Sequence, residues 1–187
     1  MTALLHAVDQ ARAARSQLAE FARFVAARTG RSFADYQALH AFSVEEVSSF
    51  WGLFLEWSGL IVSGDTQPVC RGDGVEEARF FPRLTLSWAE NLLAERGAEG
   101  ENAVALIACD ETGARGELTR AELRRRVRAI AAALEAQGLT AGDRVAAIAR
   151  NTAETVVACL AVTSLGASWS SVSSGVPIEI MGTSVIP

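Results

Sequence analysis

Lysine is absent from this sequence. All 17 basic residues among the 187 are arginines, so any mechanism that needs a lysine ammonium group is excluded for this polypeptide. Histidine is scarce: His6 and His40 lie far apart, without neighbouring Cys, Asp or Glu residues at ligand spacing, so no metal site is expected. The three cysteines, Cys70, Cys109 and Cys159, are widely spaced and form no C-x-x-C pair. We therefore expect reduced thiols rather than a disulfide framework or a zinc site.

Long apolar runs are also lacking. The most apolar segment, Val156 to Trp169, is shorter than the roughly 20 residues of a membrane span and is interrupted by Gly166. The amino terminus has neither a basic region nor a continuous apolar stretch, so it does not have the pattern of a secretory signal. These features predict a soluble, cytoplasmic protein with no membrane partner.

The charge pattern is mildly acidic. A net charge of -5 with scattered arginines gives no electrostatic reason to expect a nucleic-acid partner. One basic cluster stands out, formed by Arg124, Arg125, Arg126 and Arg128. Because Glu122 lies four residues before Arg126, a favourable helical spacing, the cluster is interpreted as a solvated helix face. With 50% apolar and 21% charged residues, the chain is expected to form one domain, or a domain with a helical extension.

Residues 1–62 have the pattern of a helical extension. Apolar residues recur at near-helical spacing from Leu4 to Val25, which predicts an amphipathic helix with at most one break. Gly30 suits the end of that helix, and residues 32–35 offer a cap for a short second helix.

A third helix is predicted directly afterwards. Ser43 and Glu46 have the spacing of a capping box, which places the start of a helix that runs to about Trp57. The same helix also carries Val47, Phe50, Trp51, Phe54 and Leu55. We expect these side chains to pack the helix onto a neighbouring domain, with a ligand pocket as the alternative.

Residues 63–101 are expected to connect this extension to a second region. The stretch 63–78 is rich in Gly, Pro, Asp and Ser and has no apolar periodicity, which indicates an irregular connection and the best internal boundary. The rest of the segment contains the motif from Phe80 to Leu93.

Residues 102–173 predict a βαβαβ order. The predicted strands are Ala103–Ala108, Arg144–Ala149 and Ala167–Val172. Thr119 and Glu122 form a second capping box that begins a helix ending near Gly138, and Asn151 is expected to cap the next helix. Right-handed crossovers would make the strands neighbours in one parallel sheet. The predicted fold class is therefore α/β, with a helical amino-terminal extension followed by a partial parallel sheet.

Short motifs along the chain resemble one enzyme family. They are Phe33-Ala34-Asp35-Tyr36, Leu39-His40, Ser43-Val44-Glu45, Phe50-Trp51, Phe80-Phe81-Pro82, Ala89-Glu90-Asn91-Leu92-Leu93, Glu117-Leu118-Thr119, Gly142-Asp143-Arg144-Val145-Ala146 and Gly166-Ala167-Ser168-Trp169-Ser170-Ser171. In this order they resemble the amino-terminal part of the acetoacetyl-CoA synthetases, which belong to the adenylate-forming superfamily. The Trp169-Ser170-Ser171 run is the most discriminating, because acetyl-CoA synthetases generally lack it.

The resemblance implies a two-step reaction on small molecules: acetoacetate attacks the α-phosphorus of ATP, with magnesium present, and CoA then displaces AMP. It also implies a phosphate loop that ends in lysine and a second lysine from a carboxy-terminal domain. Neither lysine is present, so the chain is predicted to be inactive alone and to need no cofactor by itself. No catalytic, cofactor-binding or metal-ligating residue is assigned. Ser170 and Ser171 are expected near a strand carboxyl end, where open sheets bind ligands, and a structural role is favoured over substrate contact.

The carboxy-terminal segment 174–187 diverges from the family, which usually continues with Cys-Ser-Pro-Asp-Phe-Gly. We therefore expect a frameshift or an early stop after residue 173, with the missing part encoded downstream. Two alternatives stay open. One is a non-catalytic interaction module that associates through an open sheet edge with a partner or a second copy. The other is a gene product without a selected function.

Overall fold

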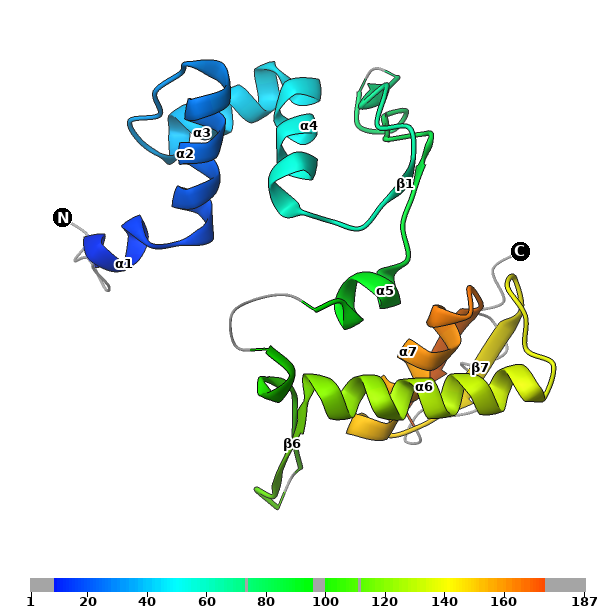
Figure 1. Ribbon diagram of the computed structural model, residues 1–187. Coiled ribbons are helices and arrows are strands. Elements are labelled where there is room, and N and C mark those ends of the chain that lie inside the picture. The colour runs from blue at the N-terminus through cyan, green and yellow to red at the C-terminus, as the bar shows by residue number, and fades with distance from the viewer. Residues whose placement is uncertain (1–8, 73, 96–99, 111, 174–187) are drawn as a thin grey trace. The chain divides into compact units, whose positions relative to one another are not determined.

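A computed structural model describes residues 9–72, 74–95, 100–110 and 112–173 of the chain (Figure 1). The chain divides into two compact units, one within residues 1–85 and the other within residues 86–187. His6, the start of the first predicted helix and the divergent segment 174–187 lie outside the described residues.

The first unit begins with four helices. They are α1 (Gln10–Ala14), α2 (Gln17–Thr29), α3 (Tyr36–Glu45) and α4 (Val47–Ser58). The expected single break of the first helix is confirmed at Ser16, whose hydroxyl begins α2 by accepting a hydrogen bond from the Ala19 amide at 3.2 Å. Gly30 ends α2 as predicted, with a left-handed φ of 70° that side chains rarely tolerate.

The predicted capping box at Ser43 is wrong. Ser43 lies inside α3, and its hydroxyl donates to the carbonyl oxygen of His40 at 2.7 Å. The helix starts earlier because the Asp35 carboxylate accepts a hydrogen bond from the Ala38 amide at 2.9 Å, which confirms the expected cap at residues 32–35. Glu46 forms the junction of α3 and α4, and its carboxylate pairs with Arg31 rather than with a backbone amide.

An aromatic core holds these helices together. The Phe21 side chain is 3% exposed, and its ring centroid lies 5.4 Å from Phe50, 5.5 Å from Phe54 and 5.2 Å from Trp57. Packing was the expected role of the α4 rings, but these three pack on α2 of their own unit rather than on a neighbouring domain. Edge-to-face and tilted ring pairs of this kind add to the stability gained from burial alone.

Two short antiparallel pairs complete the first unit. The strands are β1 (Ser63–Gly64), β2 (Cys70–Arg71), β3 (Arg79–Phe80) and β4 (Leu84–Thr85), and β1 pairs with β4 while β2 pairs with β3. Gly64 is required at its position, because a Cβ atom there would lie 2.3 Å from the Arg83 carbonyl oxygen. The predicted irregular connection therefore contains local β-pairing.

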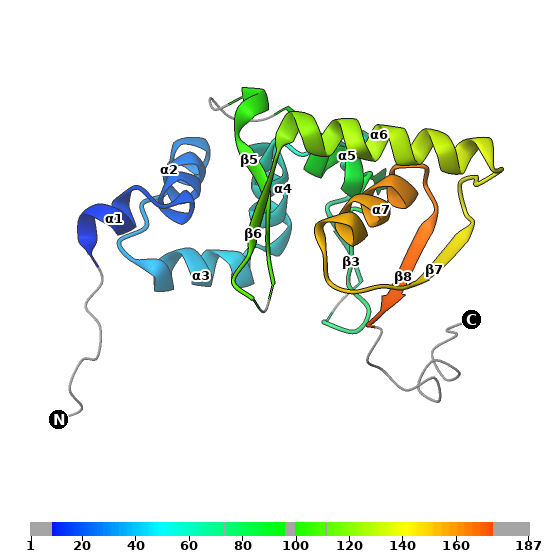
Figure 2. The same ribbon diagram turned by 90° about the horizontal axis from the view of Figure 1, so that it is seen from below.

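The second unit is a mixed α/β structure (Figure 2). Its elements are α5 (Trp88–Leu93), the short 3-10 helix η1 (Gly100–Asn102), β5 (Val104–Cys109), β6 (Arg115–Thr119), α6 (Arg120–Ala136), β7 (Arg144–Ile148), α7 (Ala153–Ser164) and β8 (Ser168–Val172). The core joins α5, α6 and α7 around Ala89, Val127 and Ala161.

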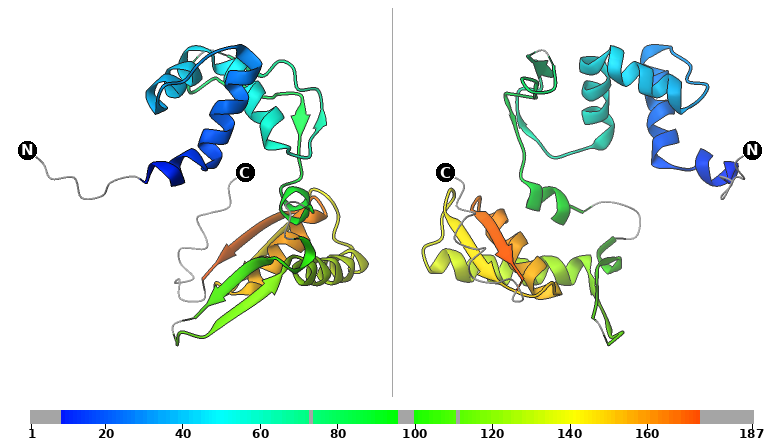
Figure 3. Two further views of the ribbon diagram at one scale, coloured as in Figure 1. Left: turned by 60° about the vertical axis from the view of Figure 1, so that its left-hand side comes forward. Right: turned by 180° about the vertical axis from the view of Figure 1, so that it is seen from behind.

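The α/β class is confirmed, but the prediction of one three-stranded parallel sheet is wrong. β7 and β8 pair in parallel as expected, whereas β5 pairs antiparallel with β6, a strand that the sequence analysis did not predict (Figure 3). In the described part of the chain, β5 and β7 belong to separate two-stranded sheets. A tight turn folds β6 back onto β5, with Gly113 at a φ of 83°.

The capping box predicted for α6 is confirmed for Thr119, while the Glu122 carboxylate bonds Arg126 instead of the N-cap amide. The Thr119 hydroxyl accepts a hydrogen bond from the Glu122 amide at 3.2 Å, and Leu118 and Leu123 are both buried in the core. The helix ends one residue before Gln137, close to the predicted stop at Gly138. α7 starts one residue later than predicted, with Thr152 rather than Asn151 as its N-cap residue.

The arginine cluster on α6 is only partly a solvated face. The expected pair of Arg126 with Glu122 is confirmed at 2.6 Å, and the Arg125 side chain is 71% exposed. Arg124 departs from the prediction: its side chain is only 9% exposed, and its guanidinium donates to the Leu93 carbonyl oxygen at 2.9 Å and pairs with Glu101. One arginine of the cluster is therefore part of the unit's interior.

Candidate functional site

The two serines singled out from the sequence lie on β8. Ser170 is paired in register with Ala146 of β7, and Ser171 with Ala147. Both serines are exposed, and β8 ends one residue after Ser171. Their expected position near the carboxyl end of a parallel strand is therefore what the structure shows, on the edge where open α/β sheets bind ligands.

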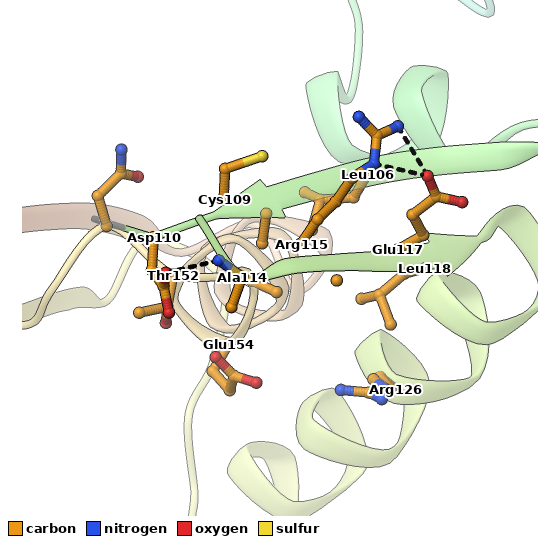
Figure 4. A pocket seen from close by; sticks show the side chains of 14 residues that line it. Leu106, Cys109, Asp110, Ala114, Arg115, Glu117, Leu118, Arg126, Thr152 and Glu154 are labelled. Carbon is orange, nitrogen blue, oxygen red and sulfur yellow. Dashed lines mark hydrogen bonds and ion pairs between the residues drawn. The ribbon is translucent and has the colours of Figure 1, made fainter. Parts of the chain in front are cut away.

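A separate pocket of about 430 Å³ lies beside the β5–β6 hairpin (Figure 4). It is lined by the end of β5, by β6, by Arg126 of α6 and by residues 151–154 at the start of α7. Neither of the two β8 serines lines it, so the structure does not bring the predicted position and this pocket together. The sequence analysis missed the pocket because it missed β6, which forms one wall.

Asp110 at the end of β5 closes the hairpin. One of its carboxylate oxygens accepts hydrogen bonds from the Thr112 hydroxyl at 2.7 Å, the Thr112 amide at 2.9 Å and the Ala114 amide at 3.0 Å. The Thr112 hydroxyl, with help from the backbone amides, lowers the pKa of Asp110 below its ordinary value. This carboxylate stays ionised at neutral pH, and its hydrogen bonds stabilise the turn.

Both arginines of the pocket are paired with carboxylates. Arg115 donates two hydrogen bonds to Glu117, at 2.7 and 3.0 Å (Figure 4). Arg126 donates two hydrogen bonds to Glu122, at 2.6 and 3.1 Å. At the start of α7, backbone hydrogen bonding at its own amide and the Thr152 hydroxyl lower the pKa of Glu154. A carboxyl group that acts as a general acid at neutral pH needs a raised pKa, so Asp110 and Glu154 do not fit that role.

Neither a metal site nor a nucleophilic role for Cys159 finds support among the described residues. No group of three or more His, Cys, Asp or Glu side chains there is placed to hold a metal ion. Burial raises the pKa of the Cys159 thiol, which disfavours the thiolate that a nucleophile requires. Of the helices in these parts of the chain, none has the length and apolar character to cross a membrane.

Comparison with known proteins identifies the protein family that the chain resembles. Residues 93–183 match the AMP-binding enzyme family. The chain is 45% identical over 159 residues to acetoacetyl-coenzyme A synthetase of Rhizobium meliloti (strain 1021), covering 85% of this chain and 24% of the relative. It is 36% identical over 161 residues to acetoacetyl-CoA synthetase of Xenopus tropicalis, covering 84% and 24%. It is also 34% identical over 166 residues to malonamoyl-CoA synthetase of Penicillium aethiopicum, covering 84% and 22%.

A solved structure extends the match to three dimensions. Acetoacetyl-CoA synthetase from Streptomyces lividans superposes with a TM-score of 0.77 at 35% identity, over 88% of this chain and 26% of that chain. The fold and these matches define the class as that of the AMP-binding, adenylate-forming enzymes. Within that class the chain belongs to the acetoacetyl-CoA synthetase family, and it spans about a quarter of the length of the relatives it matches.

Proposed function

We propose that the chain forms the amino-terminal part of an acetoacetate–CoA ligase. The observation that carries the proposal is the match to acetoacetyl-CoA synthetases in both sequence and structure, at 45% identity over 85% of the chain and with a TM-score of 0.77. On this basis residues 1–62 are a helical extension, residues 63–101 a connection, and residues 102–173 the first part of the AMP-binding domain. We place the protein in the cytoplasm, where these small-molecule substrates occur.

The reaction of the complete fold would proceed in two balanced steps. The acid carboxylate attacks the α-phosphorus of ATP and releases pyrophosphate, and the CoA thiolate then attacks the acyl carbon and releases AMP. Magnesium would neutralise phosphate charge in the first step. Acetoacetate and malonamate, the acids in the names of the relatives, both have a carbonyl group two carbons from the carboxylate, which favours short acids of this type as substrates.

Acting alone, the chain should not catalyse either step. Stabilising the charge that develops on the phosphates and the carboxylate needs preorganised cations, which the family resemblance assigns to two lysines. The chain has no lysine, and Arg115 and Arg126, the arginines that line the pocket, are already paired with carboxylates. In the complete fold of such a ligase those charges would be supplied by lysines, which this sequence does not contain.

An assay of the purified chain with ATP, magnesium, acetoacetate and CoA tests this proposal. We expect neither acetoacetyl-CoA nor AMP above a heat-killed control, while the Rhizobium meliloti enzyme under the same conditions forms both. Acetoacetate-dependent AMP release by the chain alone would show that the lysine-free polypeptide contains a complete site. It would refute the proposal that the chain is inactive by itself.

A further inference from the structure

The β2–β3 hairpin of the first unit places two arginines directly opposite each other. Arg71 of β2 and Arg79 of β3 are partners in the antiparallel register, next to the pair of Cys70 and Phe80. Residues opposed in this way have their Cβ atoms about 4.5–5.5 Å apart, with both side chains on the same face of the sheet. Both arginines are exposed. One face of the hairpin therefore presents two neighbouring guanidinium groups to solvent.

The other face of the hairpin is held against α4. The Phe80 ring contacts the Trp51 ring, with the two centroids 5.4 Å apart, and Val69, directly before β2, is only 6% exposed. The Phe81 amide donates to the Val69 carbonyl oxygen at 2.7 Å. Because successive side chains of a strand point to opposite faces, Arg79 points away from α4 when Phe80 packs against it. The arginine pair is thus carried on a packed support.

Neither Arg71 nor Arg79 has a counter-charge in the described part of the chain. Glu76 and Glu77, in the turn of the same hairpin, are exposed and form no ion pair with either arginine. Like charges directly opposite each other destabilise an antiparallel pair. Departures from a local rule of this kind are expected at functional sites. The unpaired arginines therefore indicate a site for an anion.

The charge of the pair indicates which anion fits it. Elsewhere in this chain one arginine is enough for a carboxylate, since Glu117 accepts two hydrogen bonds from the single guanidinium of Arg115. A phosphate group carries about two negative charges at neutral pH and three acceptor oxygens, so it can pair with two guanidinium groups at once. We propose that Arg71 and Arg79 bind a phosphate group, either the free ion or a phosphomonoester of a small molecule. This site is independent of the proposed ligase function.

A titration of the whole chain followed by NMR tests the site. The side-chain Nε–Hε signals of Arg71 and Arg79 are assigned with the variants Arg71→Gln and Arg79→Gln. They are recorded against phosphate, methyl phosphate and acetate at constant ionic strength, because salt screens exposed charges. We expect both signals to saturate with the same phosphate dissociation constant. In each single variant the signal of the remaining arginine should saturate at a phosphate concentration at least about tenfold higher, because one charged partner is lost. Acetate should bind more weakly than phosphate.

The matched control is Arg15→Gln, which removes an exposed arginine of the same unit and should leave the phosphate dissociation constant unchanged. Shifts that rise without saturating overturn the proposal, and so does a constant that stays the same in Arg79→Gln, because the arginines would then act only as isolated surface charges. The two phosphate probes separate the sources of the ligand. Methyl phosphate that binds at least as tightly as phosphate assigns the site to an ester, and weaker binding of methyl phosphate assigns it to the free ion.

Discussion

Arg124 is buried, although Arg125 next to it in the sequence is exposed. Arg124 belongs to a run of arginines predicted to form a solvated helix face. Its guanidinium instead lies in the interior of the second unit, where it donates to the Leu93 carbonyl at the end of α5 and pairs with Glu101 in η1. Sequence spacing could not predict this, because the two partners lie far from Arg124 along the chain. The buried arginine therefore fixes both ends of the segment between α5 and η1 onto α6.

Replacing Arg124 should destabilise the second unit. Arg124→Met keeps the apolar stem but leaves the Leu93 carbonyl without its donor, and we expect a loss of about 1–3 kcal/mol in the free energy of unfolding. Glu101 is 51% exposed and can be rehydrated, which keeps the loss below that of a fully buried pair. Urea denaturation measures the change. Arg125→Met, at an exposed site, should stay within about 0.5 kcal/mol of wild type, and equal losses would contradict the assigned role.

Asp110 should give the hairpin a measurable acid sensitivity. Its folded-state pKa is lowered, so the stabilisation is present above the unfolded-state pKa and is lost as pH falls through the lower folded-state value. We expect the β5–β6 turn to loosen below about pH 4, the range in which an ordinary Asp titrates. An NMR titration of the carboxyl carbon measures the pKa, and Thr112→Val should raise it. An unchanged value in that variant would show that the hydroxyl is not the main cause.

At the scale of elements, the two predicted capping boxes had opposite outcomes. Thr119 caps α6 as expected, whereas Ser43 lies within α3 because Asp35 starts that helix first. Both sequences carry the same Ser/Thr and Glu spacing, so local spacing alone could not separate them. In the second case Asp35, upstream, is the residue that caps the helix.

This contrast gives a matched pair of substitutions. Thr119→Ala removes an N-cap hydrogen bond and should cost about 1 kcal/mol of unfolding free energy. Ser43→Ala removes a hydroxyl that only bonds a carbonyl of its own helix, and should change stability by less than about 0.5 kcal/mol. Denaturation curves of both variants and of the wild type measure these changes in unfolding free energy. A larger loss for Ser43→Ala would restore the capping box that the structure rejects.

Strand β6 could not be predicted from the periodicity of apolar residues. Its residues Arg115, Gly116 and Glu117 are exposed and have no alternating apolar pattern, so nothing in the segment resembles a buried strand. Pairing comes instead from the Asp110 turn and from the register of Leu106 with Leu118. The helices and the β7–β8 pair could be predicted from the sequence because their own residues carry the apolar pattern.

At the scale of the whole molecule, the chain spans about a quarter of the length of the relatives it matches. The described residues supply a helical unit and an α/β unit. In the pocket, Arg115 pairs with Glu117 and Arg126 pairs with Glu122. Family membership followed from motifs spread along the sequence. The sequence contains no lysine, the residue type to which the family resemblance assigns the catalytic charges, which is why no catalytic residue could be assigned.

The most direct measurement of the central claim is the acetoacetate-dependent formation of AMP and acetoacetyl-CoA by the chimera of residues 1–173 and the remaining part of the Rhizobium meliloti enzyme. If the chain is the amino-terminal part of such a ligase, the chimera should retain activity within about tenfold of the intact relative, a change of about 1.4 kcal/mol in activation free energy. A folded, monodisperse chimera that forms neither product would contradict the claim.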